Sequence, residues 1–329
     1  MRTAHRRIHR PASRPRRLGR DHISTHGVVT TRCRSGKGDA RPAPASSPGK
    51  HGHVIQISGA FQGNRRAAAG IPLCQRRPPR AFRMKRPTAE QREAARRSPG
   101  GRRPVMHQRW ENLLFLHWTV DRDDIQRTLP RGLHADTFAG TGWIGVVPFA
   151  MRNVRPAGLP AAGSLSNFLE LNVRTYVHDD DGVPGVWFYS LDCNQPLAVL
   201  AARTFFRLPY EHSTMRADFG PTIDYHSTRR GTSAEAHYTW RPHGETRCAT
   251  AGSLEFFLLE RYHLYATRGP HLCRGTVAHA PYEFREAKID RCSVLPAALA
   301  GFDALAPQPQ HACHADGFDV RIFALERLK

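Results

Sequence analysis

The sequence contains no run of roughly 18 apolar residues, the length that a helix needs to cross a lipid bilayer. No apolar segment follows the arginines near its start, so a secretory signal peptide is not indicated either. These absences argue against a helical membrane protein, and we expect no membrane partner.

Cysteine is scarce and irregularly placed. Two of the seven cysteines, Cys33 and Cys74, precede residue 84, and the other five form no Cys-x-x-Cys pair. An odd number of widely spaced cysteines is typical of single thiols in a reducing compartment. The sequence therefore predicts a cytoplasmic protein.

Several catalytic motifs are missing as well. The sequence has no glycine-rich phosphate loop after a strand, no Gly-x-Ser-x-Gly elbow and no His-Glu-x-x-His pair, which removes the usual support for nucleotide binding, serine hydrolysis and zinc proteolysis. The segment His311-Ala312-Cys313-His314 has metal-binding residue types, but neighbouring ligands alone cannot complete a tetrahedral zinc site. We expect no metal and no cofactor.

Charge is distributed very unevenly along the chain. Residues 1–105 hold 26 of the 49 basic residues and 4 of the 28 acidic ones, so residues 106–329 are nearly neutral with 23 and 24. Residues 1–83 are too poor in apolar side chains to offset the entropy of ordering. Three interpretations of this segment stay open: a disordered basic tail, a transit peptide, or upstream sequence translated from a mis-called start codon. In the last case Met84 or Met106 would be the true start. We expect no nucleic acid to bind the folded part.

The remaining chain divides into a polar lead-in over residues 84–105 and a single domain over 106–329. Strand patterns dominate this domain, and short helices interrupt them, with Asp121, Asn194 and Ser253 as predicted N-caps. Pro148, in a strand expected over 143–149, indicates an edge or a bulge. The fold class predicted is α+β with mostly antiparallel strands. The strands are expected at 112–118, 143–149, 168–177, 185–192, 213–219, 234–240, 271–279 and 318–325.

The strand over 168–177 carries the strongest functional signal. Because side chains alternate along a strand, one face is apolar and the other carries a row of polar groups. An acid, an amide, a guanidinium and a phenol on one face suit a polar pocket wall, although the solvent face of an ordinary strand would look similar. The polar face consists of Phe168, Glu170, Asn172, Arg174 and Tyr176.

Two further segments hold chemically useful side chains. Tyr210, Glu211 and His212 follow a turn at Pro209, either as part of a site or as a core tyrosine with two solvated neighbours. Glu260 and Arg261 lie in an apolar context, where a buried ion pair is the preferred interpretation.

With these segments in view, the chain from about Met84 onward resembles the YqjF-like family of uncharacterised bacterial proteins. The resemblance rests on segments that occur in order along the chain. They are residues 106–110, 113–118, 147–149, 170–176, 186–188, 190–192, 208–210 and 259–262.

The YqjF-like family is distantly similar to the acetoacetate decarboxylase-like fold, which implies a closed β cone or barrel with an internal pocket. In the decarboxylases the turn after the helix reads Pro-Lys-Lys, and its first lysine forms a Schiff base. Here Pro209 is followed by Tyr210 and Glu211, and residues 106–329 contain only Lys288 and Lys329. Schiff-base chemistry is therefore not expected, whereas a pocket and an inward Glu170 are.

Three functions stay open. An enzyme acting on a small carbonyl or carboxylate compound would use Glu170 as acid or base, Tyr210 or His212 to assist proton transfer, and Arg174 to hold an anion, with Asn172 and Tyr176 as further binding groups. A non-catalytic protein would only bind a small metabolite with the same residues. A structural or interaction protein would keep the polar row as an internal network.

Overall fold

The structure is a computed structural model that describes residues 85–97 and 99–328. The expectations for residues 1–83, and for where translation starts, lie outside the described residues. Within the described part, no helix combines the length and the apolar character needed to cross a membrane.

Thirteen strands form one sheet, in which the pairs β5–β6 and β5–β9 are parallel and the others antiparallel. The strands are β1 (Met106–Val120), β2 (Leu133–Ala135), β3 (Gly142–Pro156), β4 (Phe168–Asp179), β5 (Pro184–Cys193), β6 (Tyr210–Phe219), β7 (Ile223–Arg229), β8 (Ala236–Cys248), β9 (His263–Arg268), β10 (His271–Ala278), β11 (Glu283–Arg291), β12 (His311–Ile322) and β13 (Glu326–Arg327). The helices are α1 (Ala89–Ala95), α2 (Arg122–Thr128), α3 (Pro196–Ala201), α4 (Leu254–Leu259) and α5 (Leu295–Leu299), with a 3-10 turn η1 (Gly163–Ser166) and a π-helical turn η2 (Ala202–Phe206).

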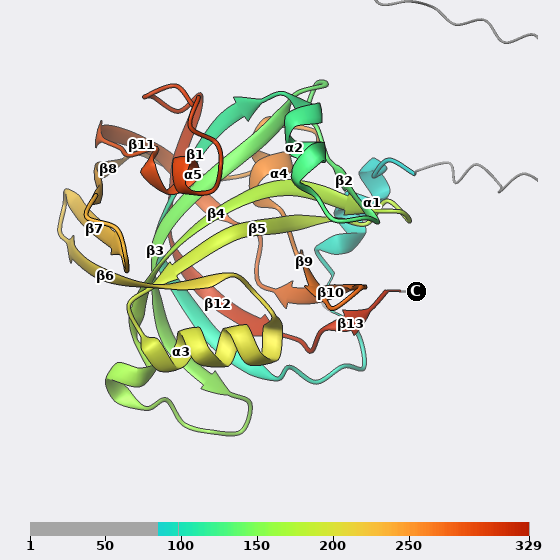
Figure 1. Cartoon of the computed structure of the whole chain (residues 1–329), viewed down its shortest axis with the longest axis horizontal. Coiled ribbons are helices and arrows are strands. Elements are labelled where there is room, and N and C mark those ends of the chain that lie inside the picture. The colour runs from blue at the N-terminus through green and yellow to red at the C-terminus, as the bar shows by residue number, and fades with distance from the viewer. Residues whose placement is uncertain (1–84, 98, 329) are drawn as a thin grey trace, which may run out of the picture. The chain divides into compact units, whose positions relative to one another are not determined.

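The sheet closes on itself. Pairing runs from β5 through β6, β7, β8, β11, β12, β1 and β3 to β4, and β4 pairs back to β5. A second closure joins β10 to β12. The short helices lie around this ring of strands (Figure 1). The predicted α+β class with a closed, mostly antiparallel sheet is therefore confirmed.

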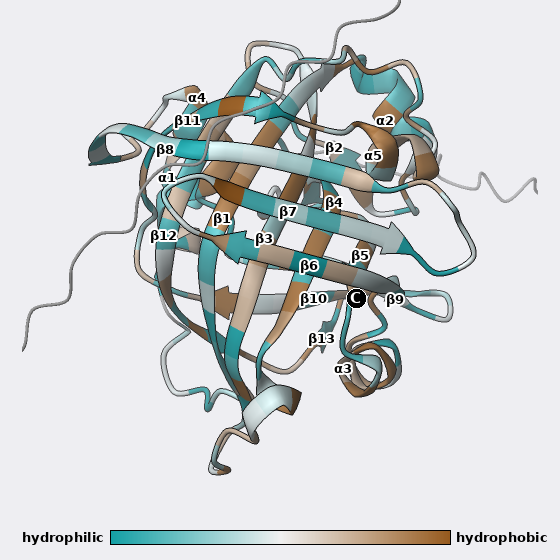
Figure 2. Cartoon of the chain, turned by 90° about the vertical axis from the view of Figure 1, so that its left-hand side faces the viewer, coloured by the Kyte–Doolittle hydropathy of each residue, from teal (hydrophilic) through white to brown (hydrophobic). Residues whose placement is uncertain are grey.

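β4 separates two environments, as its alternating sequence predicts. Its apolar face, with Leu169, Leu171 and Val173, joins a core that also contains Tyr225, Tyr238 and Trp240 of β7 and β8. In Figure 2, β6, β7 and β8 cross in front of β1, β3 and β4, so this core lies between two crossing layers of strands. The other face of β4 points to the opposite side of the ring.

The helix caps agree with the sequence except at α3. Asp121 accepts a hydrogen bond from the backbone N–H of Asp123 at α2, and Ser253 accepts one from Phe256 at α4. The N-cap of α3 is Gln195, not Asn194. The Asn194 side chain instead accepts a 2.8 Å hydrogen bond from the Leu169 backbone and so ties the start of the helix to β4.

Pro148 marks a bulge and not an edge. β3 is paired on both sides, to β1 and to β4. Pro148 faces a register shift in β1 between Glu111 and Leu116, and Asn112 adopts a left-handed conformation there, with φ of 53°. The shift accommodates a residue that has no N–H to donate to the neighbouring strand.

Candidate functional site

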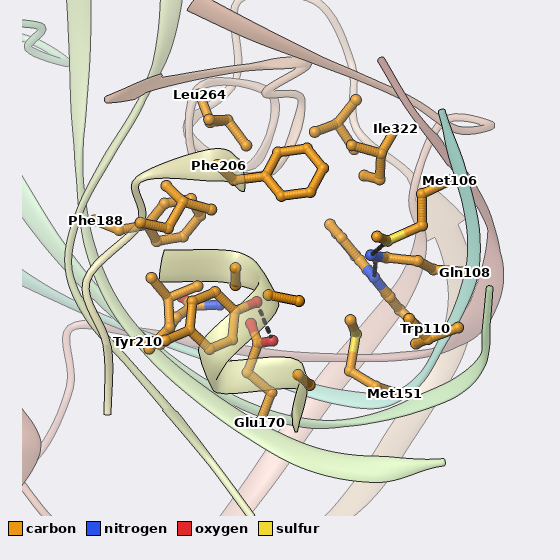
Figure 3. A pocket seen from close by; sticks show the side chains of 18 of the residues that line it. Met106, Gln108, Trp110, Met151, Glu170, Phe188, Phe206, Tyr210, Leu264 and Ile322 are labelled. Atoms are coloured by element: carbon orange, nitrogen blue, oxygen red, sulfur yellow. Dashed lines mark hydrogen bonds between the residues drawn. The ribbon is translucent and has the colours of Figure 1, made fainter. Parts of the chain in front are cut away.

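A cavity of about 570 Å³ lies against the polar face of β4, on the side of the second closure, where β9, β10 and β12 contribute to its wall. Strands β1, β3 and β5 supply further walls, and α3 with η2 covers one side. Figure 3 shows most of the wall to be carbon, with a carboxylate and a phenol at its base. The apolar wall includes Met106, Met151, Phe188, Phe206, Leu264 and Ile322.

Glu170 is the acidic group of this wall. Its side chain is buried, and the Tyr210 hydroxyl donates a 2.7 Å hydrogen bond to its Oε2 (Figure 3). Burial raises the pKa of Glu170 to about 7, because a carboxylate away from water loses its hydration, while hydrogen bonds from Tyr210 and Asn172 act in the opposite direction. The carboxyl group is therefore poised to gain or lose a proton near neutral pH.

Tyr210 reaches Glu170 because the chain turns sharply before β6. Arg207 ends η2 in a left-handed conformation with φ of 55°, and β6 then begins parallel to β5, with Tyr210 opposite Leu191. Burial, followed by the neighbouring Glu170 carboxyl, raises the pKa of Tyr210 well above its usual value. Tyr210 therefore stays a phenol, and a hydrogen-bond donor, throughout the physiological range.

Arg174 is a buried cation whose charge is not matched by a carboxylate. It is 6% exposed and lines the cavity, and no acidic side chain of the described residues lies within ion-pair distance of it. Its guanidinium lies over the rings of Phe115 and Tyr176, at 5.3 and 5.7 Å, and donates a long hydrogen bond of 3.4 Å to the Leu258 carbonyl. An unmatched buried guanidinium provides binding energy for an anion.

Asn172 lies between these two charged groups on the same face of β4. It is 5% exposed, and its Oδ1 lacks a hydrogen-bond donor among the described residues. A buried amide oxygen without a donor is costly unless a ligand or water supplies one. Asn172 can therefore accept a hydrogen bond from a molecule in the cavity.

The predicted site residues do not all meet. Glu170, Asn172, Arg174 and Tyr210 line the cavity together. Tyr176 is fully buried but contacts Phe257 and His117 outside the cavity wall, and His212 is a half-buried residue of β6 that does not line the cavity.

Glu260 and Arg261 do not pair with each other, which corrects the predicted ion pair. Arg261 lies 2.8 Å from Asp136, and Glu260 lies 3.6 Å from Arg96. The residues diverge because α4 ends there and the chain turns into β9. Arg261 also lines the cavity, which makes it a second cation near the ligand space.

The lead-in helix α1 belongs to this ion network. Arg92 pairs with Asp136 through two hydrogen bonds of 2.7 Å, and Arg96 contacts Glu260. The segment expected only as a polar lead-in is thus attached to the folded body through buried carboxylates.

Gln108 and Trp110 line the cavity but escaped the sequence analysis. The alternation of Met106, Gln108 and Trp110 was the available signal. It was missed because the expected strand began at 112, whereas β1 begins at Met106.

No lysine is present among the described residues that line the cavity. Lys288, on β11, is exposed.

His311 and His314 contact different partners. His311 Nδ1 lies 2.9 Å from His117 Nδ1, and His314 Nε2 lies 3.1 Å from Asp316.

Known proteins resemble this chain in sequence and in fold. The family model DUF2071, described as an uncharacterized conserved protein, matches residues 107–319. The uncharacterized protein YqjF of Bacillus subtilis (strain 168) is 39% identical over 188 residues, which are 56% of this chain and 77% of that protein.

Two solved structures have a similar fold. An acetoacetate decarboxylase-like enzyme from Sphingomonas wittichii RW1 superposes with a TM-score of 0.50 at 14% identity, over 69% of this chain and 94% of that one. Acetoacetate decarboxylase from Legionella pneumophila gives a TM-score of 0.49 at 11% identity, over 71% and 91%. The first of these superpositions confirms the predicted resemblance to the acetoacetate decarboxylase-like fold, as a likeness of fold alone.

Proposed function

We propose a function for this chain, which belongs to the DUF2071 family of uncharacterized conserved proteins: it binds an apolar carboxylic acid and exchanges a proton with it through Glu170. The observation that carries the proposal is the presence, in one cavity, of a carboxyl group poised near neutral pH and a buried guanidinium that no carboxylate of the described residues neutralises.

The cavity favours a ligand with a sizeable apolar part. Its volume of about 570 Å³ lies within the range typical of sites for small organic molecules. Arg174 would hold the carboxylate of the ligand, and Asn172 would accept a hydrogen bond from it. The Cα atoms of Glu170 and Arg174 are four residues apart on one strand, about 13 Å, so a ligand that touches both extends along β4.

The reaction class we infer is proton transfer at a carbon next to a second carbonyl of the ligand, at the end away from the carboxylate that Arg174 would hold. Glu170 would act as the acid or the base, and Tyr210, hydrogen-bonded to it, would stabilise its ionised form. A Schiff base is not part of the proposal, because no lysine lies on the described cavity wall. We give Tyr176 and His212 no part in this step, because neither lines the cavity.

Non-catalytic binding of a small apolar acid is the second candidate. The absence of a lysine from the described residues of the cavity wall favours it, since without a Schiff-base amine the same walls still recognise a carboxylate. In this second candidate, too, the binding partner would be the small apolar acid.

We keep the expectations of a cytoplasmic location and of no nucleic-acid partner. The five free thiols of the described part support the cytoplasmic location.

The test is a thermal-shift and calorimetric titration of the full chain with straight-chain and aromatic carboxylates of increasing size, each beside its uncharged amide. A ligand at 100 times its dissociation constant adds about 2.7 kcal/mol of stability. Arg174→Met should abolish the preference for the acid over the amide, whereas Arg127→Met, on an exposed residue of α2, should preserve it. If no acid binds better than its amide, the proposed anion site is wrong.

Binding and catalysis separate in a second step. Glu170→Gln should retain a keto acid whose ketone lies at the end away from the carboxylate, while solvent-deuterium exchange at the carbon next to that ketone stops. If the unaltered chain catalyses no exchange either, the proton-transfer function is wrong and non-catalytic binding is the remaining function.

A further inference from the structure

A cluster of two histidines and an aspartate lies on β7 and β8, away from the cavity. Asp224 and His226 are two residues apart on β7, so both point to the same face of the sheet. His237 lies directly opposite His226 across the β7–β8 pair. Tyr225 and Tyr238 point the other way, into the core, so this face is the outer one. β7 and β8 lie next to each other on the near side of the body in Figure 2.

The ligand atoms of the three side chains converge. His226 Nε2 lies 2.8 Å from Asp224 Oδ2, and His237 Nε2 lies 2.6 Å from Asp224 Oδ1. One ligand atom from each residue lies within 4.8 Å of the others. The His226 and His237 rings stack with centroids 3.8 Å apart, and both Nε2 atoms lie on the side of the Asp224 carboxylate.

Groups behind the cluster orient it. Glu235 Oε2 lies 2.9 Å from His226 Nδ1, and the Thr239 hydroxyl donates a 2.9 Å hydrogen bond to Asp224 Oδ1. A carboxylate behind a ligating histidine is the usual outer partner in metal sites, because it fixes the tautomer that leaves Nε2 free.

Two arginines also border the cluster. Arg216 Nη2 lies 2.8 Å from His226 Nδ1, and Arg291 Nη1 lies 3.2 Å from His237 Nδ1. Because an arginine only donates, the Arg216 and Arg291 contacts leave both histidines with the proton on Nε2, from which each donates to Asp224. Metal binding would shift both protons to Nδ1, where Glu235 can accept the one from His226, and the Arg216 and Arg291 side chains would have to withdraw.

We propose that Asp224, His226 and His237 bind one divalent transition-metal ion, with Zn²⁺ as the representative species. Two imidazoles and one carboxylate suit zinc and its neighbours, whereas Mg²⁺ and Ca²⁺ prefer an all-oxygen shell. Three protein ligands leave a fourth position to water. This site departs from the expectation that the chain binds no metal.

The metal would have a structural role at some distance from the cavity. Tyr225, between two of the ligands, donates a 2.8 Å hydrogen bond to the backbone carbonyl of Glu170. A metal that joins β7 to β8 would hold this tyrosine in place, and through it the strand that carries Glu170.

The experiment is a calorimetric titration of the metal-free full chain with Zn²⁺. His237→Ala and Asp224→Asn should each bind one Zn²⁺ equivalent fewer than the unaltered chain. Asp224→Asn keeps the shape of the site, so it tests the proposal even if His237→Ala folds poorly. His243→Ala, an exposed histidine of β8, should bind as the unaltered chain does. Because the first 83 residues contain several histidines of their own, the comparison rests on the difference between variants.

Glu235→Gln tests the outer partner and should weaken binding about 10- to 100-fold. Co²⁺ should give visible absorption bands of a four- or five-coordinate ion that disappear in the Asp224→Asn variant. Equal stoichiometry and affinity in the unaltered chain, His237→Ala and Asp224→Asn would overturn the proposal, as would the lack of any saturable Zn²⁺ binding.

Discussion

The Tyr210 hydroxyl and the Glu170 carboxyl, 40 residues apart in sequence, are joined by a 2.7 Å hydrogen bond inside a buried cavity. This contact sets the chemistry of the cavity. Burial favours the protonated carboxyl, and the phenol partly restores the ionised form by donating to it. The pKa of Glu170 near 7 reflects the balance between these two opposing effects.

The first prediction concerns the pKa of Glu170. Removing the hydroxyl in Tyr210→Phe takes away a donor that stabilises the carboxylate, so the pKa of Glu170 should rise further above about 7. Infrared difference spectra of the carboxyl band, recorded against pH with Glu170→Gln as the blank, would measure it. A pKa that falls in Tyr210→Phe would contradict the hydrogen-bond direction assigned here.

The second prediction is a pH dependence of stability. The folded chain holds a proton on Glu170 up to about pH 7, whereas the unfolded chain releases it near the ordinary value of 4.5. The Glu170 contribution is therefore fully present below about pH 4.5 and is lost as pH rises to about 7, by about 3 kcal/mol in all.

Denaturant titrations at pH 5, 6, 7 and 8 test this dependence. Glu170→Gln cannot ionise, and its free energy of unfolding should decline less over this range than that of the unaltered chain. Parallel curves for the two proteins would show that Glu170 is not the group responsible.

Much of the polar wall could be predicted because β4 encodes it locally. Its residues alternate between an apolar and a polar set, and the period of a strand assigns each set to a face. The closure of the sheet was harder to predict from residue patterns, because it depends on β7, β9 and β11, and these segments were not predicted as strands. β7 reads Ile-Asp-Tyr-His-Ser-Thr-Arg, whose apolar residues are too few to mark a strand in isolation.

The remaining cavity residues come from distant parts of the chain. Arg261 follows α4, and Gln108 lies in β1, which reaches β4 through β3. The pairing of strands that are distant in sequence brings both residues to the cavity that Glu170 lines. Sequence patterns report which face a side chain takes, but they do not report which strands become neighbours. The same limit explains why Glu260 and Arg261 were expected to pair with each other.

The third prediction tests the close approach of β5 and β9. A Cβ added at Gly185 would lie 2.7 Å from the His263 carbonyl oxygen and 2.7 Å from the Tyr265 ring. Gly185→Ala should therefore destabilise the fold by about 1–3 kcal/mol through overpacking. Gly220→Ala, which meets only Thr222 O at 3.5 Å, is the matched control and should change stability far less in denaturant titrations. Equal effects would show that β9 moves aside freely.

The last prediction concerns the ion network that holds α1 to the body. Asp136 is 4% exposed and pairs with both Arg92 and Arg261, and these two cations lower the pKa of its carboxyl despite the opposing effect of burial. Asp136→Asn keeps the shape of the side chain but leaves the buried Arg261 without its carboxylate. Breaking such a pair costs about 3–5 kcal/mol.

Asp123→Asn is the control, because its ion pair with Arg122 is exposed and should contribute less than about 1 kcal/mol. Both variants are compared by denaturant unfolding, and proteolysis near Arg97 reports whether α1 detaches. Detachment is expected in Asp136→Asn, since Arg92 loses its partner. If the two aspartate variants were equally stable, the buried network would hold neither α1 nor Arg261 in place, and the position of Arg261 at the cavity wall would need another cause.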